Sequence, residues 1–166
     1  MVRRLENSSS QNAGPTEGLR YREADVSDQP TIQEILHQAN LSFHVANASS
    51  VSECGDIGCT RVHVAERAEE ILAVLQWRSL GEEAEILDLA VRVSVRGQGI
   101  ASFLLREFLQ SLREAGVRQI LLEVRESNAA ATTLYRNFGF VAYGRRENYY
   151  RNPAEAALLL SLKVPG

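Results

Sequence analysis

Two side chains in the second half of the chain have the chemistry of a proton-transfer pair. Glu123 interrupts an apolar run, residues 119–124, that is typical of a strand buried on both faces, where a carboxylate needs a role or a partner. Tyr135 follows twelve residues later in an expected helix, and a phenol with an ordinary pKa near 10 can donate a proton without being ionised at rest. From the residues alone, Glu123 could equally form a buried ion pair with Arg125, and Tyr135 could be a core aromatic residue.

A glycine-bearing segment, Arg96-Gly97-Gln98-Gly99-Ile100-Ala101, indicates a binding loop for a phosphate group. It follows the apolar run 84–91, which is predicted to be a strand, and it opens an apolar-periodic segment that ends near Ala115. Glycines let a backbone approach an anion closely, and the first N–H groups of a helix have no intrahelical acceptor. The alternative is a turn that binds nothing.

This loop and two later blocks together resemble the GCN5-related N-acetyltransferases (GNAT), and among them the ribosomal-protein-alanine N-acetyltransferases of the RimI type. The loop is similar to the Arg/Gln-x-x-Gly-x-Gly/Ala signature of that family. The later blocks are residues 122–140, with Leu-Glu-Val-Arg-Glu-Ser-Asn and Leu-Tyr, and residues 145–150, Arg-Arg-Glu-Asn-Tyr-Tyr. The resemblance covers residues 70–164 well and residues 19–69 weakly.

The resemblance implies an enzyme that moves an acetyl group from acetyl-CoA to a primary amine by direct attack in a ternary complex. It implies that Glu123 accepts the proton of the amine and that Tyr135 donates a proton to the departing thiolate. Asn128 would cap a helix and touch the cofactor. Main-chain groups would hold the pantetheine arm and the thioester oxygen at Leu89, Ala90 and Val91. The pyrophosphate would lie at Arg96, Gly97, Gln98, Gly99, Ile100, Ala101 and Ser102.

The part that would bind the acceptor is where the sequence departs from the family. Residues 92–95 lack the usual proline, residues 42–46 keep only Phe43 of a Phe-Pro-Trp-Ser stretch, and Ala156 stands where Glu-Asp-Ala has its aspartate. Three hypotheses follow: an acetyltransferase of a protein N-terminus, such as the terminal alanine of a ribosomal protein; an acetyltransferase of a small-molecule amine; and a non-enzymatic acyl-CoA-binding module. The last would be expected to lose Glu123 or Tyr135, and both are present.

Hydrophobic periodicity predicts an α/β fold with a GNAT-type mixed, mostly antiparallel central sheet and helices on both faces. Helices are expected at 29–40, from the glycine loop to about 115, and at 128–138, with Leu104, Leu105, Phe108 and Leu112 as the core stripe of the second. Strands are expected at 19–24, 61–65, 71–77, 84–91, 119–124, 141–150 and 157–164.

Composition indicates one domain in residues 18–166, preceded by a disordered tail, residues 1–17, that is rich in Ser, Asn and Gly. No apolar run approaches the roughly 20 residues that a membrane span needs. With a net charge of −3, we expect a cytoplasmic protein without a membrane or nucleic-acid partner. Cys54 and Cys59 are too few for a zinc site and are expected to be free thiols, so no metal is expected.

Overall fold

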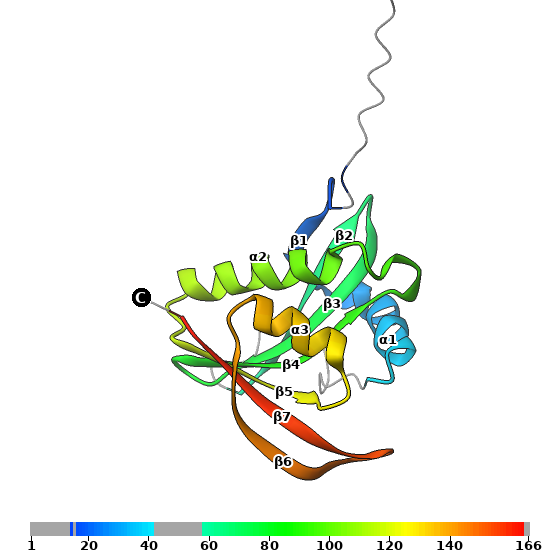
Figure 1. Ribbon diagram of the computed structural model, residues 1–166. Coiled ribbons are helices and arrows are strands. Elements are labelled where there is room, and N and C mark those ends of the chain that lie inside the picture. Colours follow the sequence, from blue (N-terminus) through cyan, green and yellow to red (C-terminus); the bar gives the residue numbers. More distant parts are fainter. Residues whose placement is uncertain (1–13, 15, 42–57, 165–166) are drawn as a thin grey trace, which may run out of the picture.

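The computed structural model describes residues 14, 16–41 and 58–164, which form a seven-stranded mixed sheet with helices on both faces (Figure 1). This confirms the expected fold class. The strands lie in the order β1-β2-β3-β4-β5-β7-β6. Their bounds are β1 Arg20–Glu23, β2 Thr60–Arg67, β3 Glu70–Ser79, β4 Glu83–Val91, β5 Gln119–Arg125, β6 Val141–Arg151 and β7 Ala154–Lys163. The helices are α1 Gln29–Gln38, α2 Ile100–Glu114 and α3 Ala129–Asn137, with short 3-10 turns at Val26–Asp28 and Val93–Val95.

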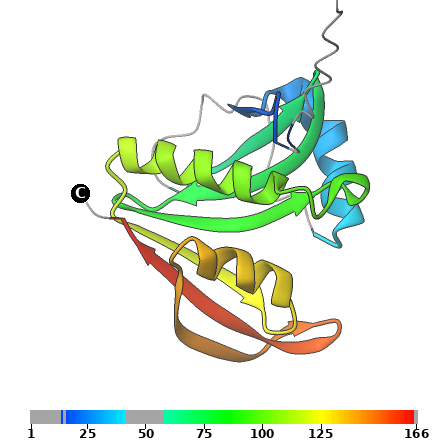
Figure 2. The same cartoon turned by 45° about the horizontal axis from the view of Figure 1, so that its top comes forward.

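Each face of the sheet has its own hydrophobic core. The helices α2 and α3 cover one face, where Leu104, Leu105 and Phe108 of the predicted stripe are fully buried (Figures 1 and 2). The helix α1 covers the other face, packing Ile32, Ile35 and Leu36 against β2, β3 and β4. The core under α1 contains no residue of β5 among those described. Among the described residues, α1 therefore does not cover this face of β5.

The expectation that residues 119–124 are buried on both faces is wrong, because only one face of β5 packs in a hydrophobic core. Burial alternates along β5, with Ile120, Leu122 and Val124 buried and the residues between them only half-buried. The buried set faces α2 and α3, whereas Glu123 lies on the face of the sheet that α1 covers elsewhere. Glu123 therefore stands on the less protected side of the strand.

The cysteine prediction is wrong for Cys59, which is disulfide-bonded. The number of cysteines does not decide whether they are bonded, because a disulfide depends on how close the fold brings two sulfurs. Cys54, residues 42–46 and the tail up to residue 13 lie outside the described residues. None of the described helices is both long and apolar enough to cross a membrane.

A half-buried histidine, His63, lies between the sheet and α2. The His63 ring stacks on Tyr21 with centroids 5.0 Å apart, and the Phe108 ring centroid is 5.8 Å away. Its Nδ1 atom is buried without a hydrogen-bond partner among the described residues. Burial, with a smaller contribution from Arg61, lowers the pKa of His63 to about 4. The folded protein therefore holds His63 neutral.

We expect His63 to lower the stability of the protein at mildly acidic pH, above the range in which the carboxylates of the protein become protonated. The pKa of His63 in the folded protein lies below the ordinary 6.5, so the unfolded chain binds a proton more readily than the folded protein does. The free energy of unfolding is therefore at its full value above pH 6.5 and falls as pH drops toward 4. The free energy of unfolding should fall by about 2 kcal/mol between pH 7 and pH 5. Denaturant unfolding at both pH values should show this loss in the parent and in a His37→Phe control, since His37 is exposed. An equal loss in His63→Phe would contradict the assignment.

Candidate active site

A cavity opens where β4 and β5 separate. The two strands pair in parallel only from Glu83–Gln119 to Ile86–Leu122 and then diverge (Figure 2). Just beyond the last pair, β4 carries a bulge: Gln76 and Trp77 of β3 oppose Asp88 and Ile86, so that Leu87 is an extra residue. The cavity between the strands has a volume of about 1340 Å³. The bulge and the short pairing together leave the β4 edge from residue 87 to 91 facing this cavity.

The bulge at Leu87 also reverses which β4 residues face each helix layer. Before it, Ile86 packs in the core under α2, whereas after it Ala90 packs in the core under α1. Asp88 lies two residues before Ala90 in the same strand, so its side chain projects from the same face, the α1 side, as that of Glu123 does. Leu89 and Val91 face α2 instead. The cavity is therefore a passage through the sheet with a different set of side chains on each side.

The glycine loop forms the α2-side wall of the cavity. Gly97 and Gly99 have φ angles of 76° and 78°, a left-handed conformation that favours glycine, and Gly99 is the N-cap of α2. The first backbone hydrogen bond of the helix runs from the Phe103 N–H to the Gly99 carbonyl at 2.9 Å. The N–H groups of the preceding turn are thus directed out of the helix end. Arg96 does not point at them, since its Nε donates to the Val91 carbonyl at 3.1 Å.

The structure brings nearly all the sequence-predicted site residues to this one cavity. Glu123, Tyr135, Asn128 and residues 89–91 line it. The glycine loop contributes Arg96, Gly97, Gly99, Ile100, Ala101 and Ser102. Gln98 is not among the lining residues.

Glu123 has a specific ionic partner, although a different one from the arginine that the sequence suggested. Its Oε1 lies 2.6 Å from Nη1 of Arg146, and its side chain is 19% exposed. A hydrogen bond with the same carboxylate raises the pKa of Tyr149. Arg125 instead pairs with Glu155 at 3.2 Å, so the alternative of a Glu123–Arg125 ion pair is not the one that forms. Glu123 therefore lines the cavity with its carboxylate held by an arginine.

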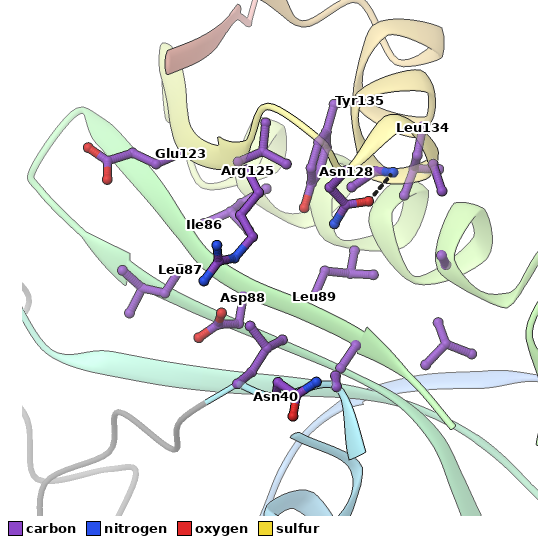
Figure 3. A pocket seen from close by; sticks show the side chains of 18 of the residues that line it. Asn40, Ile86, Leu87, Asp88, Leu89, Glu123, Arg125, Asn128, Leu134 and Tyr135 are labelled. Carbon is purple, nitrogen blue, oxygen red and sulfur yellow. Dashed lines mark hydrogen bonds between the residues drawn. The ribbon is translucent and has the colours of Figure 1, made fainter. Parts of the chain in front are cut away.

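Tyr135 enters the cavity from α3, on the other side of the sheet from Glu123. Asn128 caps this helix, since its Oδ1 accepts the Ala131 N–H at 3.0 Å. The Tyr135 ring is buried and packs edge-on against Phe140 with centroids 5.5 Å apart. Burial, with a smaller contribution from the Asp88 charge, raises the pKa of Tyr135, so the phenol keeps its proton. Figure 3 shows its hydroxyl beside Asn128, with the Glu123 carboxylate at the opposite end of the pocket.

Sequence reasoning missed a second carboxylate in the opening. Asp88 accepts a hydrogen bond at 3.1 Å from Nε2 of Gln76, whose side chain is fully buried. Burial raises the pKa of Tyr150, with smaller contributions from Glu123 and Asp88. The signal was available, because Asp88 interrupts the apolar run 84–91 in the way that Glu123 interrupts its own strand. Tyr149 and Tyr150 complete this end of the cavity.

The arrangement suits a reaction between two molecules that enter from opposite faces. An anionic group can lie against the helix end at the glycine loop. A cationic or proton-bearing group can approach Asp88 and Glu123 from the α1 side. A protonated phenol, Tyr135, lies beside the passage between the two sides. Group transfer with separate proton acceptor and proton donor is the chemistry that this geometry favours.

Known proteins resemble this chain in sequence and in fold. The ribosomal protein bS18-alanine N-acetyltransferase of Haemophilus ducreyi is 35% identical over 57% of this chain and 67% of its own length. A putative enzyme of the same name from Bacillus subtilis is 37% identical over 50% of this chain. This chain spans about half of that relative's length, 55%.

Solved structures cover more of the chain. The ribosomal-protein-S18-alanine N-acetyltransferase of Escherichia coli superposes with a TM-score of 0.73 at 26% identity, covering 89% of this chain and 95% of its own. Ard1 from Thermoplasma volcanium gives 0.74 at 25% identity, covering 90% and 99%. The sequence profile of the Acetyltransferase (GNAT) family matches residues 21–140, from β1 to the end of α3. Because this match covers most of the chain, the protein belongs to the GNAT acetyltransferase family.

Proposed function

We propose that this protein transfers an acetyl group from acetyl-CoA to the N-terminal α-amino group of a protein, with a ribosomal protein as the first candidate. The observation that carries the proposal is the opening between β4 and β5. It joins the glycine loop on one side of the sheet to Glu123 on the other. The bS18-alanine acetyltransferases among the relatives supply the acceptor class. The proposed reaction is direct transfer within a ternary complex.

The glycine loop fits the pyrophosphate of acetyl-CoA. Among the described residues, a Cβ built on Gly97 would meet no atom within 4 Å, and one on Gly99 would meet only the Thr16 methyl group at 3.6 Å. The surface over both glycines is therefore open to a ligand, and the N–H groups at the start of α2 favour an anion. Main-chain groups of residues 89–91 would hold the pantetheine arm along the β4 edge, and Asn128 would contact it from α3. Bound acetyl-CoA would supply the activated acetyl group.

Glu123 and Tyr135 would divide the proton transfers between them. An α-amino group has a pKa of about 7.7–8.0, so much of the acceptor arrives as ammonium at neutral pH. Glu123, held beside Arg146, would accept that proton directly or through water. The amine nitrogen then bonds to the acetyl carbon as the carbon–sulfur bond breaks. Tyr135 would give its phenolic proton to the departing sulfur and regain one released by the nitrogen through solvent.

The test compares classes of acceptor under identical conditions. The purified protein is incubated with acetyl-CoA and three panels: hexapeptides with free N-termini, the same peptides with blocked N-termini and an internal lysine, and small primary amines. We expect CoA release and a mass gain of one acetyl group only with free N-termini, led by peptides that begin with alanine. Faster transfer to the small amines would replace this proposal with an acetyltransferase of small molecules. Binding of acetyl-CoA without transfer to any panel would indicate a non-catalytic module.

Replacing Gly99 with valine should greatly weaken acetyl-CoA binding while leaving the protein folded. At φ 78° a β-branched residue is strained by about 1–3 kcal/mol, and it would distort the loop that receives the pyrophosphate. Gly116 offers a matched control, because it has the same φ of 78° and lies just past the far end of α2. Calorimetry should show at least a tenfold loss of affinity for Gly99→Val and little for Gly116→Val. Equal affinities would place the cofactor elsewhere.

A further inference from the structure

The side chain that reaches Glu123 comes from two strands away. Glu123 of β5 lies opposite Leu159 of β7, and Arg146 of β6 lies opposite Ala157 of the same strand. Directly opposed residues of antiparallel strands share a face, so Glu123, Leu159, Ala157 and Arg146 all project from one side of the sheet. The guanidinium of Arg146 thus reaches across β7 to the carboxylate of β5.

An irregularity in β6 brings a second group to the same carboxylate. Arg146 opposes Ala157 and Tyr150 opposes Glu155, so residues 147–149 of β6 face a single residue of β7. In a regular strand, Arg146 and Tyr149 would project from opposite faces, because they are three positions apart. The irregularity, with Asn148 at a φ of 52°, lets both side chains contact Glu123. The irregularity in β6 therefore gives Glu123 two partners instead of one.

These contacts fix the carboxylate at the edge of the cavity. Arg146 Nη1 lies 2.6 Å from Glu123 Oε1, and the Arg146 guanidinium lies 5.6 Å from the centre of the Tyr149 ring. Arg146 itself is 56% exposed, and an ion pair with such an exposed partner contributes little to stability. Stability alone therefore gives a weak reason for building this contact across three strands.

We propose that Arg146 is a positioning residue, which holds the Glu123 carboxylate in place and aimed at the opening between β4 and β5. The proposal rests on the proposed function, in which Glu123 accepts the proton of the acceptor amine. Arg146 acts through Glu123 and contacts neither substrate. Its removal should therefore slow turnover with little effect on the binding of acetyl-CoA or acceptor.

The neighbouring arginine supplies a matched control. Arg145 is adjacent in sequence but projects from the opposite face of β6, where its Nη2 lies 2.7 Å from Glu126 Oε2. It also pairs with Glu147. Arg145 is not among the residues that line the cavity. Arg145→Ala thus removes the same charge from the same strand without touching Glu123.

The experiment is a double-mutant cycle on turnover of the peptide that the parent protein acetylates best. Arg146→Ala should lower kcat by roughly 10- to 100-fold, part of the 10²–10⁴ that a positioned base supplies. KM values for both substrates and the melting temperature should stay close to those of the parent. Arg146→Lys should recover most of the loss, because it restores the charge, and Arg145→Ala should match the parent. In the Glu123→Gln background, Arg146→Ala should cost nothing further.

Each contrary result has a definite meaning. Unchanged kcat for Arg146→Ala in an active parent overturns this proposal and leaves the proposed function intact. Multiplicative losses in the cycle also overturn it, since Arg146 would then act independently of Glu123. A large rise in the KM of the peptide would make Arg146 an acceptor-binding residue instead. If the parent acetylates no amine, the proposed function fails and the role of Arg146 falls with it.

Discussion

Glu123→Gln should lower kcat for the acceptor by roughly 10²–10⁴-fold at pH 7, the usual contribution of a positioned general base. Glutamine keeps the shape of the side chain and can still accept a hydrogen bond from Arg146, which now lies 2.6 Å from the carboxylate. What it loses is the capacity to take a proton. The affinity for acetyl-CoA should stay near that of the parent, because the proposed pyrophosphate site lies on the other side of the sheet.

The pH dependence of this loss separates a base from a structural residue. The α-amino group of a peptide loses its proton unaided above about pH 8, so the deficit of Glu123→Gln should shrink as pH rises toward 9.5. Steady-state kcat measured from pH 6.5 to 9.5 would show this convergence. Glu126→Gln is the matched control, because Glu126 is an exposed carboxylate three residues away that pairs with Arg145. A deficit of constant size at every pH would remove the base assignment.

The elements of the fold could be predicted because their signals are local. The stripe of Leu104, Leu105 and Phe108 at helical spacing identified α2 and its buried face without knowledge of the sheet. The two-sided burial of β5 was predicted wrongly, because it depends on which strands α1 covers, and that depends on packing between distant segments. The bulge at Leu87 was also missed. Leu87 is a leucine in an apolar run, and nothing about its residue type or neighbours indicates that it is the extra residue of a bulge.

A site residue could be predicted from the sequence where its charged side chain interrupts an apolar run. Glu123 interrupts an apolar strand and was found, whereas Asp88 gives the same kind of signal and was passed over. Spacing on the same strand offered Arg125 as an alternative partner of Glu123. The partner is Arg146, two strands away, and the pairing register of β6 and β7 is needed to find it.

Tyr135→Phe should also slow turnover strongly, by roughly 10²-fold or more, but raising the pH should not restore it. The proton that the departing thiolate needs is missing at every pH in this variant. In the parent, burial and the nearby Asp88 raise the pKa of Tyr135, so the phenol stays loaded with its proton across the whole range in which the amine titrates. The two variants should therefore differ in their pH profiles, with Glu123→Gln converging on the parent and Tyr135→Phe running parallel to it.

Stability measurements decide whether Tyr135 acts through chemistry or through packing. Phenylalanine keeps the ring that packs edge-on against Phe140 at 5.5 Å, so the melting temperature of Tyr135→Phe should change little. Tyr21→Phe is the matched control, since it removes a part-buried phenol that is hydrogen-bonded to Ser111 at 3.1 Å, outside the cavity. It should cost about 1 kcal/mol of stability and leave kcat intact. If Tyr135→Phe loses stability and keeps its kcat, as expected for Tyr21→Phe, the Tyr135 hydroxyl is structural. Identical pH profiles for Tyr135→Phe and Glu123→Gln would mean that the acid and base roles are misassigned.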